Sequence, residues 1–272
     1  MQQIGCHIDA KKYNNLVDVA LNLNTNTMQF FSRSAYGGPI KVLDIDDIKE
    51  FNKKLKENNF ENILIHAPFI INGSSDKENI RISSPEIIRE DLERVDMFGV
   101  NTFYVFHPGN HMKQGSGVGC KLIAEMLDKV NLDTFKTTVL LETMAGKGTE
   151  LGKTFEELAL IIKSCKHGER LGVCLDTCHI WDGGYDLTNL DSVLDEFDRI
   201  IGLDKLKFIH LNNSLNICGA HKDRHANIDD GKIPLDVFKA IMTNKRLENI
   251  PKILETPVDK YESDLTILKS FK

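Results

Sequence analysis

No apolar run in this sequence reaches the 18 residues that a membrane-spanning helix requires. Residues 1–7 enter a strand-like pattern directly and lack the charged and apolar regions of a secretion signal. We therefore expect no signal peptide and no membrane partner, and we predict a cytoplasmic protein.

The cysteines lack any CxxC pair and any regular spacing of the kind that a disulfide framework shows. This absence predicts reduced, mostly buried thiols, as is usual for cytosolic proteins. The six positions are Cys6, Cys120, Cys165, Cys174, Cys178 and Cys218.

The composition also lacks an excess of basic residues, and the formal net charge is −6. Because phosphate contacts favour Lys and Arg, this balance argues mildly against a nucleic-acid partner. Three bound divalent cations would, however, bring the protein close to neutrality. Net charge therefore does not decide the class of partner.

What the sequence does contain is a series of six strand-like segments that each end in Asp, Glu or His. The whole chain of 272 residues has only 40 Asp and Glu and 9 His, so chance would rarely produce such a series. The segments are residues 63–66, 103–107, 138–142, 172–176, 206–210 and 253–255, and they end in His66, His107, Glu142, Asp176, His210 and Glu255.

Strand-like and helical segments alternate along the whole chain. Two earlier strands, 3–8 and 27–31, bring the expected number to eight, and successive ends of the six later strands lie 34 to 45 residues apart. No linker or low-complexity run interrupts the pattern, so we predict a single-domain (β/α)₈ TIM barrel, an α/β fold, over residues 1–272. The expected helices are 46–59, 86–98, 118–130, 154–165, 190–201 and 233–244.

In such a barrel the C-terminal ends of all strands meet at one rim, which is where active sites lie. Three further candidate ligands follow two of these strands, namely His179, Asp223 and His225. Five His, two Glu and two Asp are too many donors for one tetrahedral ion. They suit a cluster of two or three Zn²⁺ ions, with Mn²⁺ or Fe²⁺ as competitors, and such clusters hydrolyse phosphodiesters.

These residues lie in segments that resemble the signature blocks of the endonuclease IV family, which are zinc-dependent endonucleases that cut DNA at abasic sites. The blocks occur in the family's order, and the resemblance runs from Ile4 to Glu255. They are His-Pro-Gly at 107–109, Leu-Glu-Thr-Met-Ala-Gly-Lys-Gly at 141–148, Cys-Leu-Asp-Thr-Cys-His at 174–179, His-Leu-Asn at 210–212, Asp-Arg-His at 223–225 and Leu-Glu-Thr-Pro at 254–257.

The resemblance implies three zinc ions and no organic cofactor. It also implies that a metal-bridged hydroxide attacks the phosphate 5′ to the abasic sugar and leaves a 3′-hydroxyl, with Glu142 and Glu255 as catalytic residues. The implied ligands are His66, His107 and Glu142 for the first ion, Glu142, Asp176, His210 and Glu255 for the second, and His179, Asp223 and His225 for the third.

The resemblance further implies duplex DNA with an abasic site as the partner, bound by a monomer. Phe69 and Ile70 replace the family's usual tyrosine and leucine and keep an aromatic and aliphatic wedge for a base step. Tyr36 stands where an arginine is usual, and we expect Arg33 to contact phosphate. Asn213 replaces a usual aspartate. These departures concern DNA engagement rather than the metal ligands.

Four other histidines receive different interpretations. We expect His7 and His111 to be hydrogen-bonded residues near the rim, outside the ligand set. His221 either contacts phosphate or caps its loop. We expect His167 to be a solvent-exposed residue at the C-terminal end of a helix.

Two other functions remain open at this point. Sugar isomerases and epimerases on the same barrel also carry Glu, Asp and His at strand ends, usually for one or two ions. The third set of ligands, His179, Asp223 and His225, favours the nuclease. A non-cutting protein that binds abasic DNA is the other alternative, and the presence of all nine ligand candidates argues against it.

Overall fold

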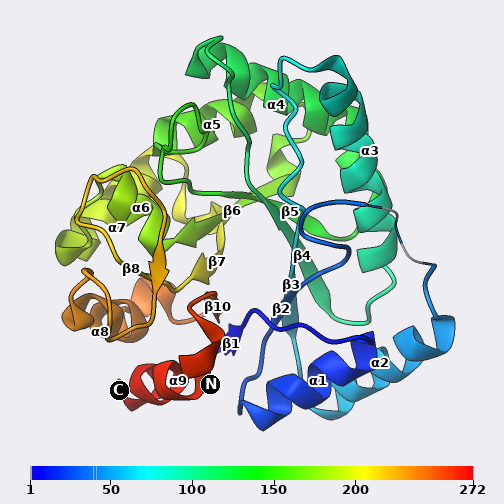
Figure 1. The fold of residues 1–272 in the computed structure, drawn as a ribbon, viewed down its shortest axis with the longest axis vertical. Coiled ribbons are helices and arrows are strands. Elements are labelled where there is room, and N and C mark those ends of the chain that lie inside the picture. Colours follow the sequence, from blue (N-terminus) through cyan, green and yellow to red (C-terminus); the bar gives the residue numbers. More distant parts are fainter. Residues whose placement is uncertain (1, 39, 41, 272) are drawn as a thin grey trace.

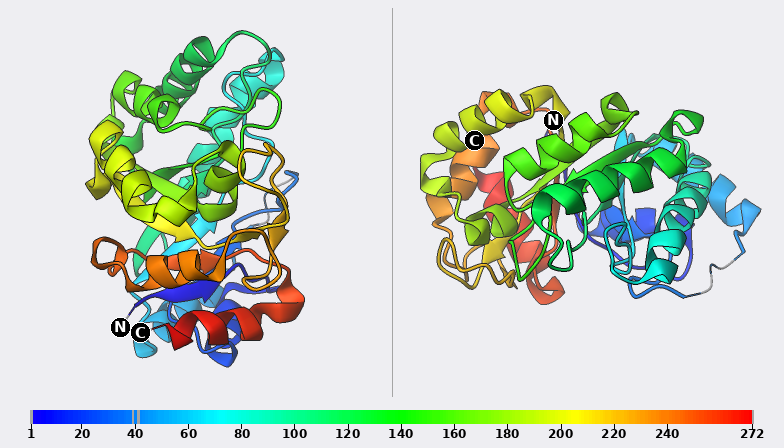
Figure 2. Two further views of the ribbon diagram at one scale, coloured as in Figure 1. Left: turned by 90° about the vertical axis from the view of Figure 1, so that its left-hand side faces the viewer. Right: turned by 90° about the horizontal axis from the view of Figure 1, so that it is seen from above.

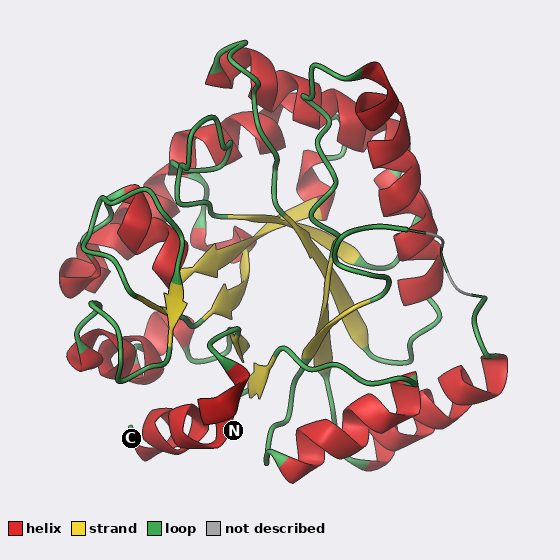
Figure 3. Ribbon diagram, viewed as in Figure 1, coloured by secondary structure: helices red, strands yellow, loops and turns green. Residues whose placement is uncertain are grey.

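Eight parallel strands form the barrel at the centre of the computed structural model, which describes residues 2–38, 40 and 42–271 (Figures 1 and 3). The strands pair in the order in which they occur along the chain, and β10 lies between β7 and β1. The barrel strands are β1 (Ile4–Cys6), β2 (Gln29–Phe31), β3 (Asn62–His66), β4 (Asn101–Phe106), β5 (Thr138–Glu142), β6 (Leu171–Asp176), β7 (Leu206–His210) and β10 (Lys252–Leu254). A separate antiparallel pair consists of β8 (Asn213–Ser214) and β9 (His225–Ala226).

The seam between β1 and β2 has less backbone pairing than the junctions between the other strands. One isolated parallel bridge joins His7 to Gln29, and the Ile8 N–H donates to the Gln29 carbonyl oxygen at 2.8 Å. The two backbones come close here, because a Cβ atom on Gly5 would lie 2.1 Å from the carbonyl oxygen of Thr27. Only glycine fits at that position.

Helices surround the barrel as an outer layer (Figure 2). Their inner faces carry apolar residues at helical spacing, as Leu190, Val193, Leu194 and Phe197 do on α7. The α-helices are α1 (Tyr13–Asn22), α2 (Ile45–Glu57), α3 (Glu78–Val95), α4 (Ser116–Val130), α5 (Phe155–Ser164), α6 (Thr177–Gly183), α7 (Leu190–Ile200), α8 (Leu235–Thr243) and α9 (Tyr261–Ser270). Short 3₁₀ helices lie at Leu132–Thr134, Gly168–Arg170, Leu187–Asn189, Leu203–Lys205, Lys245–Leu247 and Val258–Lys260.

The interior of the barrel is filled by a layer of apolar side chains. Side chains alternate between the two faces of a strand, so a residue two positions further on points to the same inner face. Each residue of this layer stands two positions before a predicted ligand, which places the six ligands at the strand ends directly above it. The layer consists of Leu64, Val105, Leu140, Cys174, Phe208 and Ile253, all fully buried.

The barrel prediction is confirmed, and the strands predicted at 138–142 and 206–210 match β5 and β7. The helix predicted at 86–98 is wrong at both ends, because α3 spans Glu78–Val95 with Pro85 inside it. Proline usually marks the first turn of a helix, so the earlier turns were missed. Three helices, α1, α6 and α9, had no prediction.

The states of the cysteines and the character of the helices can be read directly from the structure. All six cysteines are free, and all except Cys218 are buried. Within the described ranges, no helix combines the length and the apolar character that crossing a bilayer would need.

Lys252 at the start of β10 is a buried charged residue on the outer side of the barrel. Its side chain is fully buried, and its Nζ donates to the Leu247 carbonyl oxygen at 2.5 Å. Burial lowers the pKa of Lys252 to about 8, although the charge of Glu248 acts in the opposite direction. The ordinary value is 10.5. The folded protein therefore releases this proton at a lower pH than the unfolded chain does.

We predict that Lys252→Met stabilises the protein more at pH 7 than at pH 10. Below about pH 8 the wild-type folded state carries the buried charge of Lys252, which destabilises it, and methionine removes this charge. Between about pH 8 and 10.5 only the unfolded chain binds the proton, so the stability of the wild type rises with pH. The shift corresponds to about 3 kcal/mol. Urea unfolding of both proteins at the two pH values measures the difference, and an equal effect of the substitution at both would contradict the prediction.

Candidate metal centre

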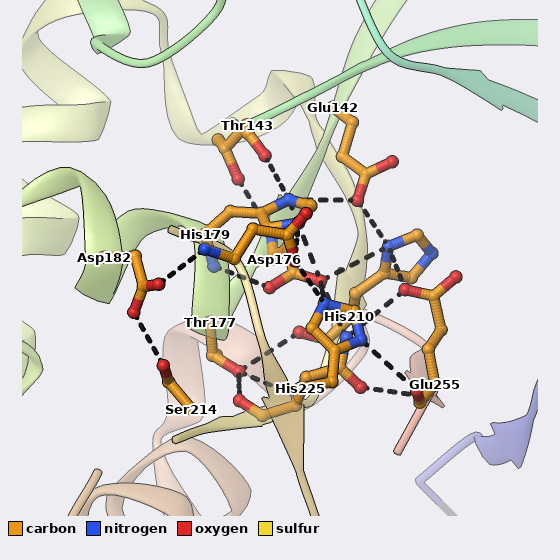
Figure 4. Close-up of polar contacts among 12 residues, drawn as sticks. Glu142, Thr143, Asp176, Thr177, His179, Asp182, His210, Ser214, His225 and Glu255 are labelled. Atoms are coloured by element: carbon orange, nitrogen blue, oxygen red, sulfur yellow. Dashed lines mark hydrogen bonds and ion pairs between the residues drawn. The ribbon is translucent and has the colours of Figure 1, made fainter. Parts of the chain in front are cut away.

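Glu142 at the end of β5 contacts histidines of both the first and the second set of predicted ligands, and Figure 4 draws it with Asp176, His179, His210 and Glu255. Its carboxylate is fully buried, and its two oxygens face different histidines. Oε2 lies 3.4 Å from His66 Nε2 and 3.2 Å from His107 Nε2. Oε1 lies 2.9 Å from His210 Nδ1 and 3.4 Å from His179 Nδ1. This is the arrangement that a carboxylate bridging two cations requires.

The second set of donors surrounds His210. Glu255 Oε2 lies 3.2 Å and Asp176 Oδ2 3.8 Å from His210 Nδ1. The ligand atoms of these three residues and of Glu142 all lie within 4.8 Å of one another, as do those of His66, His107 and Glu142. The geometry thus brings together both sets of residues that the resemblance implies for the first two ions.

The third set is more open and is shared among more residues. Asp223 Oδ1 lies 3.2 Å from His179 Nε2 and 3.4 Å from His225 Nε2. His179 and His225 also group with Asp176, while Asp223 and His225 group with Cys178. The three predicted residues are therefore adjacent, and Asp176 and Cys178 are additional donors within reach.

Hydrogen bonds fix the tautomers of the histidines. The Nδ1 atoms of His66, His179 and His225 lie 2.7, 2.8 and 3.2 Å from backbone carbonyl oxygens, which can only accept. Each Nδ1 therefore carries the proton, and the lone pair of Nε2 points into the cluster. His210 is reversed, because its Nε2 donates to Gln29 Oε1 at 2.6 Å and leaves Nδ1 for a ligand.

Two buried atoms of the cluster that could bind a metal have no hydrogen-bond partner among the described residues, namely Glu142 Oε2 and His225 Nε2. A buried polar atom without a partner is costly, and a carboxylate oxygen more so. A divalent cation would satisfy both atoms, with ligands of the types that Zn²⁺ prefers. The residues present therefore fit a metal centre.

The shifted pKa values in the cluster also favour a metal centre. Burial would raise the pKa of Glu142, but His210, His107 and His179 outweigh it and hold that pKa well below its usual range. Burial would likewise lower the pKa of His179, yet Asp176, Asp223 and Glu142 raise it well above its usual value. Without a cation, the carboxylates thus draw protons onto His179 and His210, and binding of a metal has to release them.

Three residues that the sequence analysis did not single out orient the ligands. Gln29 Nε2 donates to Glu255 Oε1 at 2.6 Å, and Asn212 Nδ2 donates to Asp176 Oδ2 at 2.7 Å. The Thr143 hydroxyl accepts from the Asp176 N–H at 2.8 Å. For Thr143 and Asn212 the available signal was a polar residue one or two positions after a predicted strand end, and for Gln29 it was a polar residue within the predicted strand 27–31.

Of the predicted DNA contacts, Phe69, Ile70 and Tyr36 form one exposed surface beside the first two histidines. Their side chains are 48%, 41% and 84% exposed. The Phe69 ring lies 5.4 Å from His66 and 6.2 Å from Tyr36 between ring centroids. Gly37 packs against Ile70, because a Cβ there would lie 2.6 Å from Ile70 Cδ1. A wedge role for these residues stays a prediction.

Arg33 lies away from this surface. Its side chain is only 5% exposed, and its Nε donates to the buried Asp91 at 2.7 Å. Asp91 also accepts hydrogen bonds from Ser32 and from the hydroxyl of Tyr104. The guanidinium would have to leave this network to reach a phosphate, so the expected phosphate contact finds no support in its placement.

The remaining histidines and Asn213 have partners within the protein. His7 Nδ1 bonds to Gln29 and His111 Nδ1 accepts from the Gly115 N–H, as expected for residues outside the ligand set. His221 Nδ1 bonds to the Ala145 carbonyl oxygen. The expectation of an exposed His167 is wrong, because that side chain is partly buried against Asp133 at 3.0 Å. The amide of Asn213 bonds to both Ile228 and Ile233, which an aspartate could not do.

Comparisons with known proteins agree with the fold. The family described as xylose isomerase-like TIM barrel matches residues 17–271. A protein of Clostridium beijerinckii called probable endonuclease 4 is 49% identical over 274 residues, covering 99% of each chain. The crystal structure of endonuclease IV from Thermus thermophilus has a TM-score of 0.87 at 28% identity, and the match covers 99% of this chain and 98% of that one.

A D-tagatose 3-epimerase-like protein is also similar in structure, with a TM-score of 0.74 at 19% identity over 99% of this chain and 97% of that chain. At this identity the likeness shows the shared barrel fold alone.

We predict that Arg33→Met lowers the free energy of unfolding by about 3–5 kcal/mol, because Asp91 would keep a buried charge without its cationic partner. Lys49→Met is the matched control, since it removes an exposed ion pair of 2.9 Å with Asp46. We expect the control to leave stability almost unchanged, because an exposed ion pair contributes little. Chemical denaturation of the three proteins measures both effects, and a small effect at Arg33 would contradict the prediction.

Proposed function

This chain belongs to the endonuclease IV family, and from that premise we propose that it is a DNA-repair phosphodiesterase that incises duplex DNA 5′ to an abasic site. Water adds to the phosphorus, the bond to the 3′ oxygen breaks, and that oxygen takes up a proton. The products are a 3′-hydroxyl and a 5′-deoxyribose phosphate. The proposal treats residues 1–272 as one domain that acts as a monomer without an organic cofactor.

The observation that carries the proposal is the position of Glu142. Its two oxygens face separate sets of histidines at distances of 2.9 to 3.4 Å, and one of them has no hydrogen-bond partner among the described residues. A single cation would not use both sides of this carboxylate. Closely spaced cations are the usual means of hydrolysing a phosphodiester.

We assign the ligands as the sequence implied. When bound, the cations would act as Lewis acids toward the phosphate and lower the pKa of water. The first would be held by His66, His107 and Glu142, the second by Glu142, Asp176, His210 and Glu255, and the third by His179, Asp223 and His225.

The chain itself supplies orientation and charge. Gln29 and Asn212 both donate to Glu255, at 2.6 and 3.2 Å, which keeps its carboxylate ionised and fixed in direction. The pKa of Glu255 is lowered to about 2, because the positive charge of His210 outweighs the effect of burial. Glu142 and Glu255 are thus anionic at neutral pH, and we propose that both orient the attacking water.

Recognition of the lesion would use the exposed surface of Phe69, Ile70 and Tyr36. A position that lacks a base costs little to unstack, so an apolar wedge enters it more readily than an intact base step. The Phe69 ring lies 5.3 Å from the His107 ring, so a nucleotide displaced by the wedge would lie beside the metal ligands.

The first experiment is incubation of the purified protein with a duplex that contains one abasic-site analogue. An undamaged duplex and an EDTA-treated sample are the controls. We expect a single EDTA-sensitive cut 5′ to the lesion that leaves a 3′-hydroxyl. Tight binding without cutting would favour a damage-binding protein. Neither binding nor cutting by the metal-loaded protein, with turnover of a ketose, would favour a sugar epimerase.

We predict that Glu142→Gln lowers the incision rate at least about 100-fold, because the amide removes the charge between the two donor sets. Glu157→Gln is the control, since Glu157 is also a buried glutamate that accepts from the N–H groups of Gly152 and Lys153. We expect that control to keep the wild-type rate. Incision by Glu142→Gln at the wild-type rate would refute the assignment of the bridging ligand.

We predict that Phe69→Ala raises the KM for abasic DNA by about 10-fold or more, because an aromatic stacking contact is lost. Hydrolysis of a small phosphodiester and the metal content should stay unchanged. Ile82→Ala, at a 62% exposed position on α3, is the control for removing an exposed apolar side chain. An equal loss on the small substrate would show that Phe69 acts through the metal ligands instead.

A further inference from the structure

Asp182 on α6 is a buried carboxylate that lies outside the ligand set. It is fully buried and follows His179 by three residues on the same helix. Its Oδ1 accepts from the Ser214 hydroxyl at 2.6 Å, a contact drawn in Figure 4. Its Oδ2 accepts from the Asn216 amide at 2.9 Å and from the Asp223 N–H at 2.7 Å. All three donors belong to the segment that follows β7.

That segment has little regular structure of its own before His225. Gly219 N–H donates to the Trp181 carbonyl oxygen and His221 N–H to the Asp182 carbonyl oxygen, both at 2.9 Å. Together with the bond from the Asp223 N–H, these bonds attach residues 219, 221 and 223 to the C-terminal part of α6. His221 and Asp223 have φ values of 53° and 59°, a region that non-glycine residues seldom adopt without such support.

The carboxylate of Asp223 is held from the opposite side. Lys147 Nζ donates to Asp223 Oδ2 at 2.7 Å, and the Lys147 N–H is in turn fixed by Glu150 at 2.8 Å. With Oδ2 occupied and the backbone N–H bound to Asp182, Oδ1 is the oxygen that faces His179 and His225. The direction of this oxygen therefore depends on two contacts outside the ligand set.

We propose that Asp182 is the positioning residue of the third metal site: it joins the helix that carries His179 to the segment that carries Asp223 and His225, and so sets the spacing of the three ligands. This inference rests on the proposed function and deepens it. Groups that orient metal ligands affect metal affinity as well as activity. Alanine at this position would remove both carboxylate oxygens, so the contact to the Asp223 N–H would be lost.

The test is a zinc titration of the purified full-length protein against a competing chelator. We expect Asp182→Ala to bind one of three zinc ions about 10–100-fold more weakly, with the other two unchanged. Asp47→Ala is the matched control, because Asp47 is also a buried aspartate that accepts from two N–H groups, those of Tyr13 and Asn14, but lies on α2. Ser214→Ala removes a donor to Asp182 without touching Asp223 and should keep all three ions.

Several outcomes would overturn the inference. One is wild-type affinity at all three sites in Asp182→Ala, and another is an equal loss at every site, which would indicate general destabilisation. If Asp182→Ala does not fold, Asp182→Ser replaces it with the same expected result, because the shorter side chain does not reach the Asp223 N–H and leaves room for water. Incision by the wild-type protein is measured in parallel; a wild type that cuts abasic DNA with only two zinc ions would refute the third site while leaving the proposed function intact.

Discussion

The two-residue period of the strands is the constraint on which the metal centre depends. An apolar side chain on the inner face of a strand fixes the direction of the residue two positions later. Leu140 inside the barrel therefore determines that Glu142 points inward, and Phe208 does the same for His210. A shift of one residue in either strand would turn its ligand toward the helices. The packed core and the cluster of charged donors are thus consequences of one register.

The balance of charge at the rim is the second constraint on the metal centre. Four carboxylates and five histidines occupy this rim, and the hydrogen bonds of His66, His179 and His225 to backbone carbonyls leave their Nε2 atoms directed into the cluster. In the absence of cations, protons on His179 and His210 balance the negative charge. Cations replace these protons, so the affinity of the site for metal and the pH of the solution are linked.

The barrel and the meeting of the nine candidate metal ligands at one rim could be predicted from the sequence, because strand periodicity and strand ends are local properties. The sequence could not reveal what the same residues touch across the fold. Arg33 reads as an exposed basic residue in a loop, and only the tertiary structure places Asp91 on α3 beside it. Nothing in the sequence distinguishes Asp182 from other aspartates, and its partners Ser214 and Asp223 come from a segment about 30 to 40 residues away. Helices α1 and α9 escaped prediction because each is ten residues long and shows only a short apolar period.

The seam between β1 and β2 gives the metal centre a structural role beyond chemistry. Few backbone bonds join these strands, yet Gln29 at the seam contacts His7, His210 and Glu255 through its side chain. The barrel is therefore closed at this point partly through residues that orient the second group of ligands. Binding of a metal ion by these residues would stabilise the junction that has the fewest backbone bonds. Local opening there would become rarer as more of the protein holds metal. Amide hydrogens along β1 and β2 should accordingly exchange more slowly with solvent in the loaded protein.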